Sequence, residues 1–146
     1  MNQVKNILSR KGITAVSVLP NTTVFEALKI MSEKNIGSVV VTENGKYLGI
    51  VTERDYSRKV ILKDKHSTST RVAEIMTSDL PHVSPEDSID YCMELMTSNN
   101  IRYLPVFANN KLGGIISITD VVKETILAQQ QTISHLENYI HSGSGL

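Results

Sequence analysis

The chain has 146 residues, of which 40% are hydrophobic, and its 15 basic residues balance its 15 acidic ones. This length and composition suit one compact domain or two small interdependent halves, and they exclude a disordered chain. The even charge balance gives no reason to expect binding to nucleic acid or to a membrane surface. Residues 1–10 lack a secretory core and no apolar run is long enough to cross a bilayer, so we expect a cytoplasmic protein.

The start of the chain predicts a short helix, a strand and a second helix. Apolar residues at helical spacing indicate an amphipathic turn or helix at 4–8, and β-forming residues indicate a strand at 13–18, which Pro20 ends. Apolar residues then recur every three to four positions and predict a helix over 23–34, closed by a turn at Asn35.

A hairpin and a further helix complete the first half. Two β-rich runs at 37–42 and 47–51 flank an Asn-Gly pair, which favours a tight turn because both residues tolerate positive φ. A helix is predicted over 52–62, and the polar, Ser- and Thr-rich residues 65–70 read as a linker. The first half therefore has the order β-α-β-β-α.

The second half repeats this order without a gap in the register. The matched residues Val18, Pro20, Met31, Asn35, Ile36, Val41, Asn44, Lys46, Gly49, Ile50 and Asp55 recur as Val83, Pro85, Met96, Asn100, Ile101, Val106, Asn109, Lys111, Gly114, Ile115 and Asp120. A duplication of this kind predicts two similar folds. We expect a first repeat at 1–64, the linker at 65–70, a second repeat at 71–128 and a C-terminal extension at 129–146.

The one cysteine, Cys92, lies in the apolar helical pattern of the second repeat. It cannot form an internal disulfide, and we expect it to fill the core rather than act as a nucleophile or ligand.

The last predicted helix is longer than its counterpart and runs from Thr119 to about Ile140. A heptad-like stripe of apolar residues follows it, interrupted by three glutamines, and Ser142 to Gly145 is expected to end the ordered chain. A helix packed on its own domain and a helix at a dimer contact fit this pattern equally.

A seven-residue motif closes each repeat. Gly49 to Asp55 and Gly114 to Asp120 both read Gly, two β-branched residues, a hydroxyl residue, two variable positions and Asp. The hydroxyl residue falls where a strand passes into a helix, and a helix start can hold an anion. The same spacing also fits a capping box, in which the hydroxyl and the acid bond to the backbone. A ligand site and a cap are compatible roles.

Two tandem repeats ending in this motif resemble a pair of cystathionine-β-synthase (CBS) domains, the Bateman module, over roughly residues 4–127. The resemblance implies an α/β (α+β) fold with small sheets packed face to face and a cleft that binds adenosine-type ligands. AMP, ADP or ATP are the expected ligands, with S-adenosylmethionine or NAD as alternatives. No catalytic or transporter sequence accompanies the two repeats, and in this the chain is similar to the stand-alone members of the family.

The resemblance also assigns residues to two ligand sites. In the family the motif aspartate accepts from both ribose hydroxyls, a role that here falls to Asp120 and Asp55. The site expected to bind more tightly comprises Thr14, Val16, Ile36, Gly37, Ser38, Arg102, Ile115, Ser117, Thr119 and Asp120. The weaker one comprises Ile50, Thr52, Arg54, Asp55, Leu80, His82, Ile101 and Tyr103. The ranking rests on Arg102, a phosphate-binding residue type that Gly37 replaces in the first repeat, and on the additional hydroxyl of Thr119.

Three functions remain open at this point. A non-enzymatic nucleotide sensor fits both motif aspartates, whereas a small nucleotide hydrolase lacks support because there is no Walker A loop and no Cys/His metal cluster. The four histidines are scattered, and His82 alone lies on a predicted cleft strand, around Leu80 to Val83. A ligand-free interaction domain is the third reading. We expect a homodimer through helical faces, with Val24, Leu28, Met31, Cys92, Met93 and Met96 as candidate contact residues, and a protein partner that reads the ligand-bound state.

Overall fold

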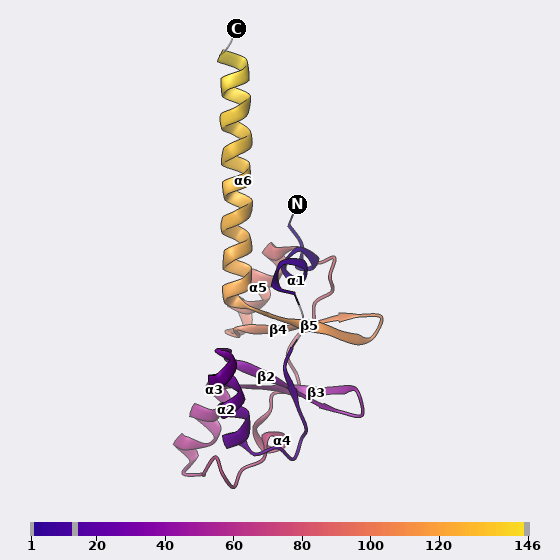
Figure 1. Cartoon of the computed structure of the whole chain (residues 1–146), viewed down its shortest axis with the longest axis vertical. Helices are drawn as coiled ribbons and strands as arrows, with labels where there is room; N and C mark the ends of the chain where they lie inside the picture. The colour runs from indigo at the N-terminus through magenta and orange to yellow at the C-terminus, as the bar shows by residue number, and fades with distance from the viewer. Residues whose placement is uncertain (1, 13–14, 145–146) are drawn as a thin grey trace. The chain divides into compact units, whose positions relative to one another are not determined.

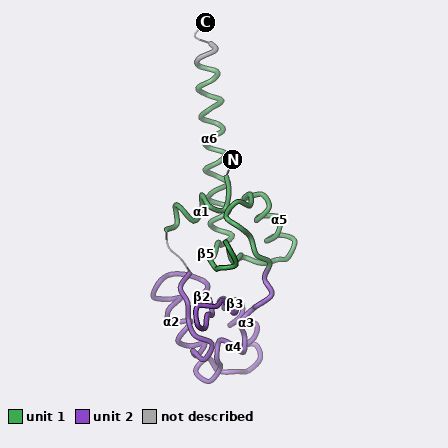
Figure 2. Tube along the Cα trace, turned by 90° about the vertical axis from the view of Figure 1, so that its right-hand side faces the viewer, with its two compact units in different colours: residues 1–14, 81–146 green, residues 15–80 purple. Residues whose placement is uncertain are grey.

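The structure, a computed structural model, describes residues 2–12 and 15–144 (Figure 1). It has the predicted mixed α+β composition, with two small sheets and a long C-terminal helix. The chain forms two compact units: residues 1–14 with 81–146 make unit 1, and residues 15–80 make unit 2 (Figure 2). Thr14 and the start of the predicted strand at 13–18 lie outside the described residues.

Unit 2 contains a three-stranded sheet in the order β1-β2-β3, with β1 parallel and β3 antiparallel to β2. Its elements are β1 (Ser17–Val18), α2 (Val24–Lys34), β2 (Ser38–Glu43), β3 (Lys46–Thr52), α3 (Glu53–Lys59), the 3-10 turn η1 (Ile61–Lys63) and α4 (Val72–Ile75). Thr23 caps the start of α2 through its hydroxyl, and Asn35 ends that helix in the left-handed conformation. The Asn44–Gly45 pair makes the predicted turn, with positive φ at both residues.

Unit 1 repeats the arrangement around an antiparallel hairpin. Its elements are α1 (Val4–Lys11), α5 (Ile89–Asn99), β4 (Tyr103–Ala108), β5 (Lys111–Ser117) and α6 (Ile118–Ser144). Residues 80–83 were expected to form a strand, but they contribute only an isolated bridge from Val83 to Val106. The Val83 amide and carbonyl bond to Pro105 and Phe107, and the neighbouring Pro81 has no amide hydrogen with which to extend a ladder.

The lead-in helices are exchanged between the repeats (Figure 2). Helix α1 begins the first repeat in sequence but lies in unit 1 with the second repeat, where the Val4 amide donates to the Asp87 carbonyl. Helix α4 begins the second repeat but lies in unit 2, where the Val72 amide donates to the Thr22 carbonyl. Each unit is therefore closed by a segment from the other repeat.

Each unit has its own apolar core. The buried residues of unit 2 include Val24, Ala27, Met31, Val39, Val41, Val51 and Val72. Those of unit 1 include Val4, Ile7, Cys92, Met96, Leu104, Val106, Ile116 and Val121. The Cys92 thiol is fully buried, and this burial with the nearby Asp87 raises its pKa to about 11. Cys92 therefore fills the core as predicted.

Two helix ends differ from the sequence prediction. The helix predicted over 52–62 stops at Lys59 and is followed by η1, because Val60 departs from regular helical geometry with φ of -116°. Helix α6 runs to Ser144, so Ser142 and Gly143 extend the helix instead of ending it.

Candidate functional site

The motif of unit 1 forms a tight junction between β5 and α6. The Ser117 hydroxyl accepts from the Asp120 amide, and the Ser117 amide donates to Asp120 Oδ2 at 2.8 Å. The next amide, that of Ile118, donates to the Arg102 carbonyl at 2.8 Å. The predicted capping box is thus present, and Arg102 lies beside the junction at the start of β4.

Lys11 from α1 reaches the Asp120 carboxylate. Its Nζ donates to Asp120 Oδ2 at 2.8 Å and to the Ile115 carbonyl at 2.9 Å. Burial on its own raises the pKa of Asp120, but the hydrogen bonds from Lys11 and Ser117 and the Lys11 charge outweigh it and lower that pKa. Asp120 is therefore a charged acceptor whose position is set by its own backbone and by a lysine.

The motif of unit 2 forms the same junction between β3 and α3. The Thr52 hydroxyl accepts from the Asp55 amide, and the Thr52 amide and hydroxyl both donate to Asp55 Oδ2, at 3.0 and 3.1 Å. The Glu53 amide donates to the Gly37 carbonyl, so Gly37 holds the place that Arg102 holds in unit 1.

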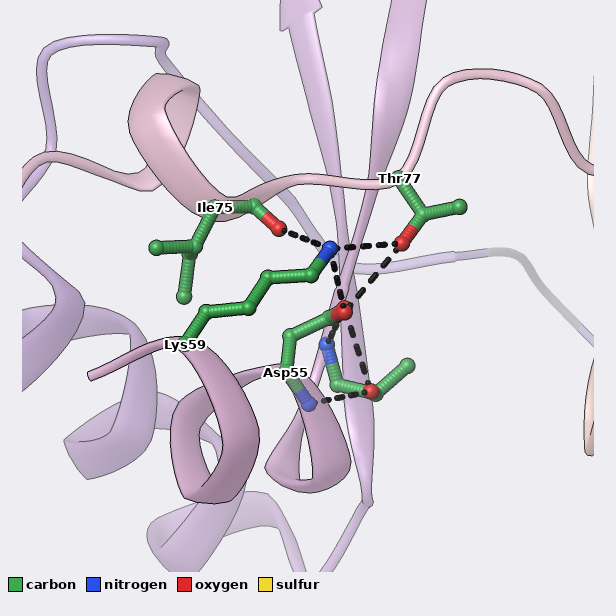
Figure 3. A network of polar contacts seen from close by, with 5 residues as sticks. Asp55, Lys59, Ile75 and Thr77 are labelled. Carbon is green, nitrogen blue, oxygen red and sulfur yellow. Dashed lines mark hydrogen bonds and ion pairs between the residues drawn. The ribbon is translucent and has the colours of Figure 1, made fainter. Parts of the chain in front are cut away.

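A second set of donors covers the other oxygen of Asp55 (Figure 3). Lys59 Nζ lies 3.0 Å from Asp55 Oδ1, and the Thr77 hydroxyl donates to the same oxygen at 3.1 Å. Lys59 also donates to the Ile75 carbonyl at 2.9 Å. Both oxygens of Asp55 therefore accept from protein donors.

The two aspartates differ in how many of their acceptor positions are taken. No residue in the described part of the chain donates to Asp120 Oδ1, while Oδ2 accepts from Lys11 and Ser117. The Asp120 side chain is 18% exposed and that of Asp55 is 10% exposed. Asp120 therefore offers one carboxylate oxygen to a ligand, whereas a ligand at Asp55 must displace Thr77 or Lys59.

Sequence reasoning missed the residues that pair with the aspartates. Lys11, Lys59 and Thr77 lie outside the two motifs, and Lys11 and Thr77 come from segments remote in sequence from their partners. Only Lys59 had a readable signal, because it follows Asp55 by four residues on a helix, the spacing of an ion pair.

Position 124, which corresponds to Lys59 in the repeat, carries the opposite charge. Glu124 is 2% exposed and forms an ion pair with Arg10 of α1, while Asn2 donates to Glu124 Oε2 at 2.6 Å. The lead-in helix of unit 1 thus brings two cations, one to Glu124 and one to Asp120.

The first position of the unit 2 motif, Gly49, is a glycine for a steric reason. A Cβ at Gly49 would lie 2.8 Å from the Thr77 carbonyl oxygen, because the chain after α4 pairs with β3 at Ile50. The close approach also brings the Thr77 hydroxyl to Asp55.

The other predicted site residues divide between the units. In the Asp120 set, Arg102, Ile115, Ser117 and Thr119 belong to unit 1, and Val16, Ile36, Gly37 and Ser38 belong to unit 2. In the Asp55 set, Ile50, Thr52, Arg54 and Leu80 belong to unit 2, and His82, Ile101 and Tyr103 belong to unit 1. Within unit 1 the structure brings Arg102, Ile115, Ser117 and Asp120 together at one junction, and Thr119 is exposed in the first turn of α6.

His82 stacks on Phe107 with ring centroids 4.2 Å apart. Across residues 2–12 and 15–144, no group of three or more His, Cys, Asp or Glu side chains is placed to hold a metal ion. No helix in the described ranges is long and apolar enough to span a membrane.

Comparison with known proteins places the chain in a family. The CBS-domain model matches residues 4–61 and 72–126. CBS domain-containing protein YhcV of Bacillus subtilis is 30% identical over 97% of both chains. The mitochondrial protein CBSX3 of Arabidopsis thaliana is 36% identical over 96% of this chain and 72% of its own length.

Solved structures agree with this assignment. A signal-transduction protein with CBS domains from Burkholderia ambifaria has a TM-score of 0.83 at 46% identity, covering 88% of this chain and 96% of its own. The CBS domain pair of protein MJ0100, crystallised with 5′-methylthioadenosine and S-adenosylmethionine, has a TM-score of 0.74 at 26% identity, covering 84% and 94%. The chain therefore belongs to the CBS-domain family and carries two such domains in tandem.

Proposed function

We propose that this CBS pair is a regulatory module that binds an adenine nucleotide and signals through conformation or assembly. The observation that carries the proposal is the pair of motif aspartates, each anchored at a strand–helix junction by its own capping box. Such anchoring holds a carboxylate in one orientation, which is what recognition of a ribose diol requires.

The proposal that the ligand contains adenosine is supported by the ligands of a structural neighbour, the CBS pair of MJ0100. The two ligands of the MJ0100 pair, 5′-methylthioadenosine and S-adenosylmethionine, share an adenosine group. Asp120, with one oxygen open among the described residues, is the stronger candidate for the ribose hydroxyls. Asp55 is the weaker candidate because both of its oxygens are occupied.

The cationic side chains at the Asp120 junction favour a ligand with a phosphate group, such as AMP, ADP or ATP. Arg102 is exposed beside the Ser117–Asp120 junction, and Lys11 lies within bonding distance of Asp120. A guanidinium and an ammonium at one junction suit a phosphate. S-adenosylmethionine, which has no phosphate, and NAD are the alternatives.

We propose binding without catalysis. The two aspartates belong to different strand–helix junctions, and each is bonded to its own hydroxyl residue, as expected for ligand anchors rather than for an acid–base pair. Incubation with ATP, followed by assay for ADP and phosphate, tests the hydrolase alternative. Turnover that depends on Asp120 would overturn the sensor proposal.

The ligand class is tested by titration calorimetry with AMP, 2′-deoxy-AMP and S-adenosylmethionine. If a carboxylate accepts from both ribose hydroxyls, AMP binds more tightly than 2′-deoxy-AMP by about 10- to 150-fold, since one hydrogen bond to a charged group is lost. Equal affinity for the two would exclude ribose recognition by the aspartates. Tighter binding of S-adenosylmethionine than of AMP would contradict the proposal that a phosphate group lies at the charged end of the ligand.

We also propose a cytoplasmic homodimer that presents the ligand state to a protein partner. Two solved relatives at 32% and 33% identity are described as hexameric CBS-CP12 proteins, so pairs of this family do assemble. Four of the residues expected at the contact, Val24, Met31, Cys92 and Met96, are instead buried in the two cores. The interface must therefore use other surfaces.

A further inference from the structure

The C-terminal part of α6 is exposed to solvent. Val121 and Glu124 are buried against unit 1, and Thr125 and Ala128 are half-buried, but every residue from Gln129 to His141 is exposed. The helix leaves the body of unit 1 over this stretch (Figure 1). In proteins most of the stability of a helix comes from packing of its apolar face, so an exposed apolar face on this stretch marks a candidate contact surface.

An apolar stripe runs along the exposed side of α6. Its members recur with a heptad spacing that keeps them on one face, and they are Val122 (41% exposed), Ile126 (47%), Ile133 (55%), Leu136 (56%) and Ile140 (62%), with Gln129 at the remaining position. The buried residues Val121 and Glu124 lie on a different face. The stripe is therefore not the surface that packs on unit 1.

We propose that the stripe pairs with the same stripe of a second copy of this chain, in antiparallel orientation. In that orientation the two stripes match along their whole length: Val122 meets Ile140, Ile126 meets Leu136, and Gln129 meets Ile133. A self-complementary surface of this kind closes a twofold dimer. It rests on the homodimer proposed above and names its interface, and it requires no nucleotide.

Charge selects the antiparallel orientation. Lys123 and Glu137 are exposed residues flanking the stripe on the same side of it. Antiparallel pairing places Lys123 beside the second copy's Glu137, and the reverse, which gives two ion pairs. Parallel pairing places like charges at the same level, which is less favourable.

A groove next to the stripe leaves room for the second helix. It has a volume of about 700 Å³, lies between α6 and the start of α5, and is lined by residues that include Ser88, Asp90, Gln129 and Ile133. Gln129 and Ile133 belong to both the groove and the stripe. In the antiparallel dimer, Gln129 and Ile133 of the second copy's α6 lie along this part of the helix.

Light scattering of the full chain tests the interface. The wild type is expected at twice the monomer mass, Leu136→Glu at half the wild-type mass, and the matched control Asn138→Glu, on the opposite face of α6, at the wild-type mass. Because Leu136 is exposed, the variants should keep their fold, and circular dichroism checks this. A monomeric wild type, or a Leu136→Glu protein of unchanged mass, overturns the proposal.

Charge reversal tests the orientation. Lys123→Glu and Glu137→Lys should each raise the dimer dissociation constant by several-fold, and the double variant should restore it. In a parallel dimer these residues lie about 21 Å apart along the axis, so the double variant would not recover. Failure of recovery overturns the antiparallel register, whatever the result of the nucleotide titrations.

Discussion

The two strand–helix junctions share one sequence motif, but their aspartates differ in how many carboxylate oxygens accept hydrogen bonds from the protein. At Asp120, Lys11 and Ser117 share Oδ2, and no described residue donates to Oδ1. At Asp55, Thr52 takes Oδ2, and Lys59 and Thr77 take Oδ1. A sequence motif therefore specifies where a carboxylate lies, but the segments packed around it decide how much of its hydrogen-bonding capacity is left for a ligand.

The largest expected effect separates the two aspartates. Asp120→Ala should weaken AMP binding at its site by about 10- to 150-fold, since loss of hydrogen bonds to a charged group costs about 1.5–3 kcal/mol. Asp55→Ala should change the overall isotherm much less. Calorimetry on both variants measures this, and because each also loses one capping box, thermal unfolding of the pair controls for stability. Equal losses, or a loss only in Asp55→Ala, would reverse the ranking.

A smaller effect tests why Asp55 is weaker. Thr77→Val removes one donor from Asp55 Oδ1 while keeping the shape of the side chain. On an Asp120→Ala background, where only the Asp55 site reports, AMP affinity should rise by about 2- to 10-fold, the equivalent of about 0.5–1.5 kcal/mol. Thr97→Val, which removes a hydroxyl bonded only within α5, is the control. Unchanged affinity would show that occupied oxygens do not limit binding.

The smallest effect is on the pH dependence of stability. Asp120 has a lowered pKa in the folded protein, so its contribution is fully present above the unfolded pKa and is lost as pH falls through the folded pKa. Lys11→Met should remove part of this contribution. The pair is partly exposed, at 39% and 18%, so the difference should stay below about 1 kcal/mol near neutral pH.

Urea unfolding of the wild type and of Lys11→Met between pH 7 and pH 3 measures this difference. The two proteins should converge as the solution becomes acidic. A difference that is independent of pH would assign Lys11 a packing role instead of an electrostatic one.

Much of the fold followed from local patterns. The Asn-Gly turn, the Thr23 cap and the left-handed Asn35 are short-range features whose residue types specify the backbone, and they predicted the hairpin and α2. The predictions of secondary structure were wrong where contacts between residues distant in sequence determine the structure. Residues 80–83 have the composition of a strand but make one bridge, and the helix after Thr52 ends at Lys59.

The sequence by itself determined the duplication, the family and the place of both motif aspartates, because hydrophobic period, turn residues and capping boxes act within a few residues of each other. Only the tertiary structure decided that α1 joins the second repeat and α4 the first, and that Lys11 reaches Asp120 while Thr77 reaches Asp55. Those contacts join residues far apart in the chain, and their formation depends on how whole elements pack. The same packing left the stripe of α6 exposed.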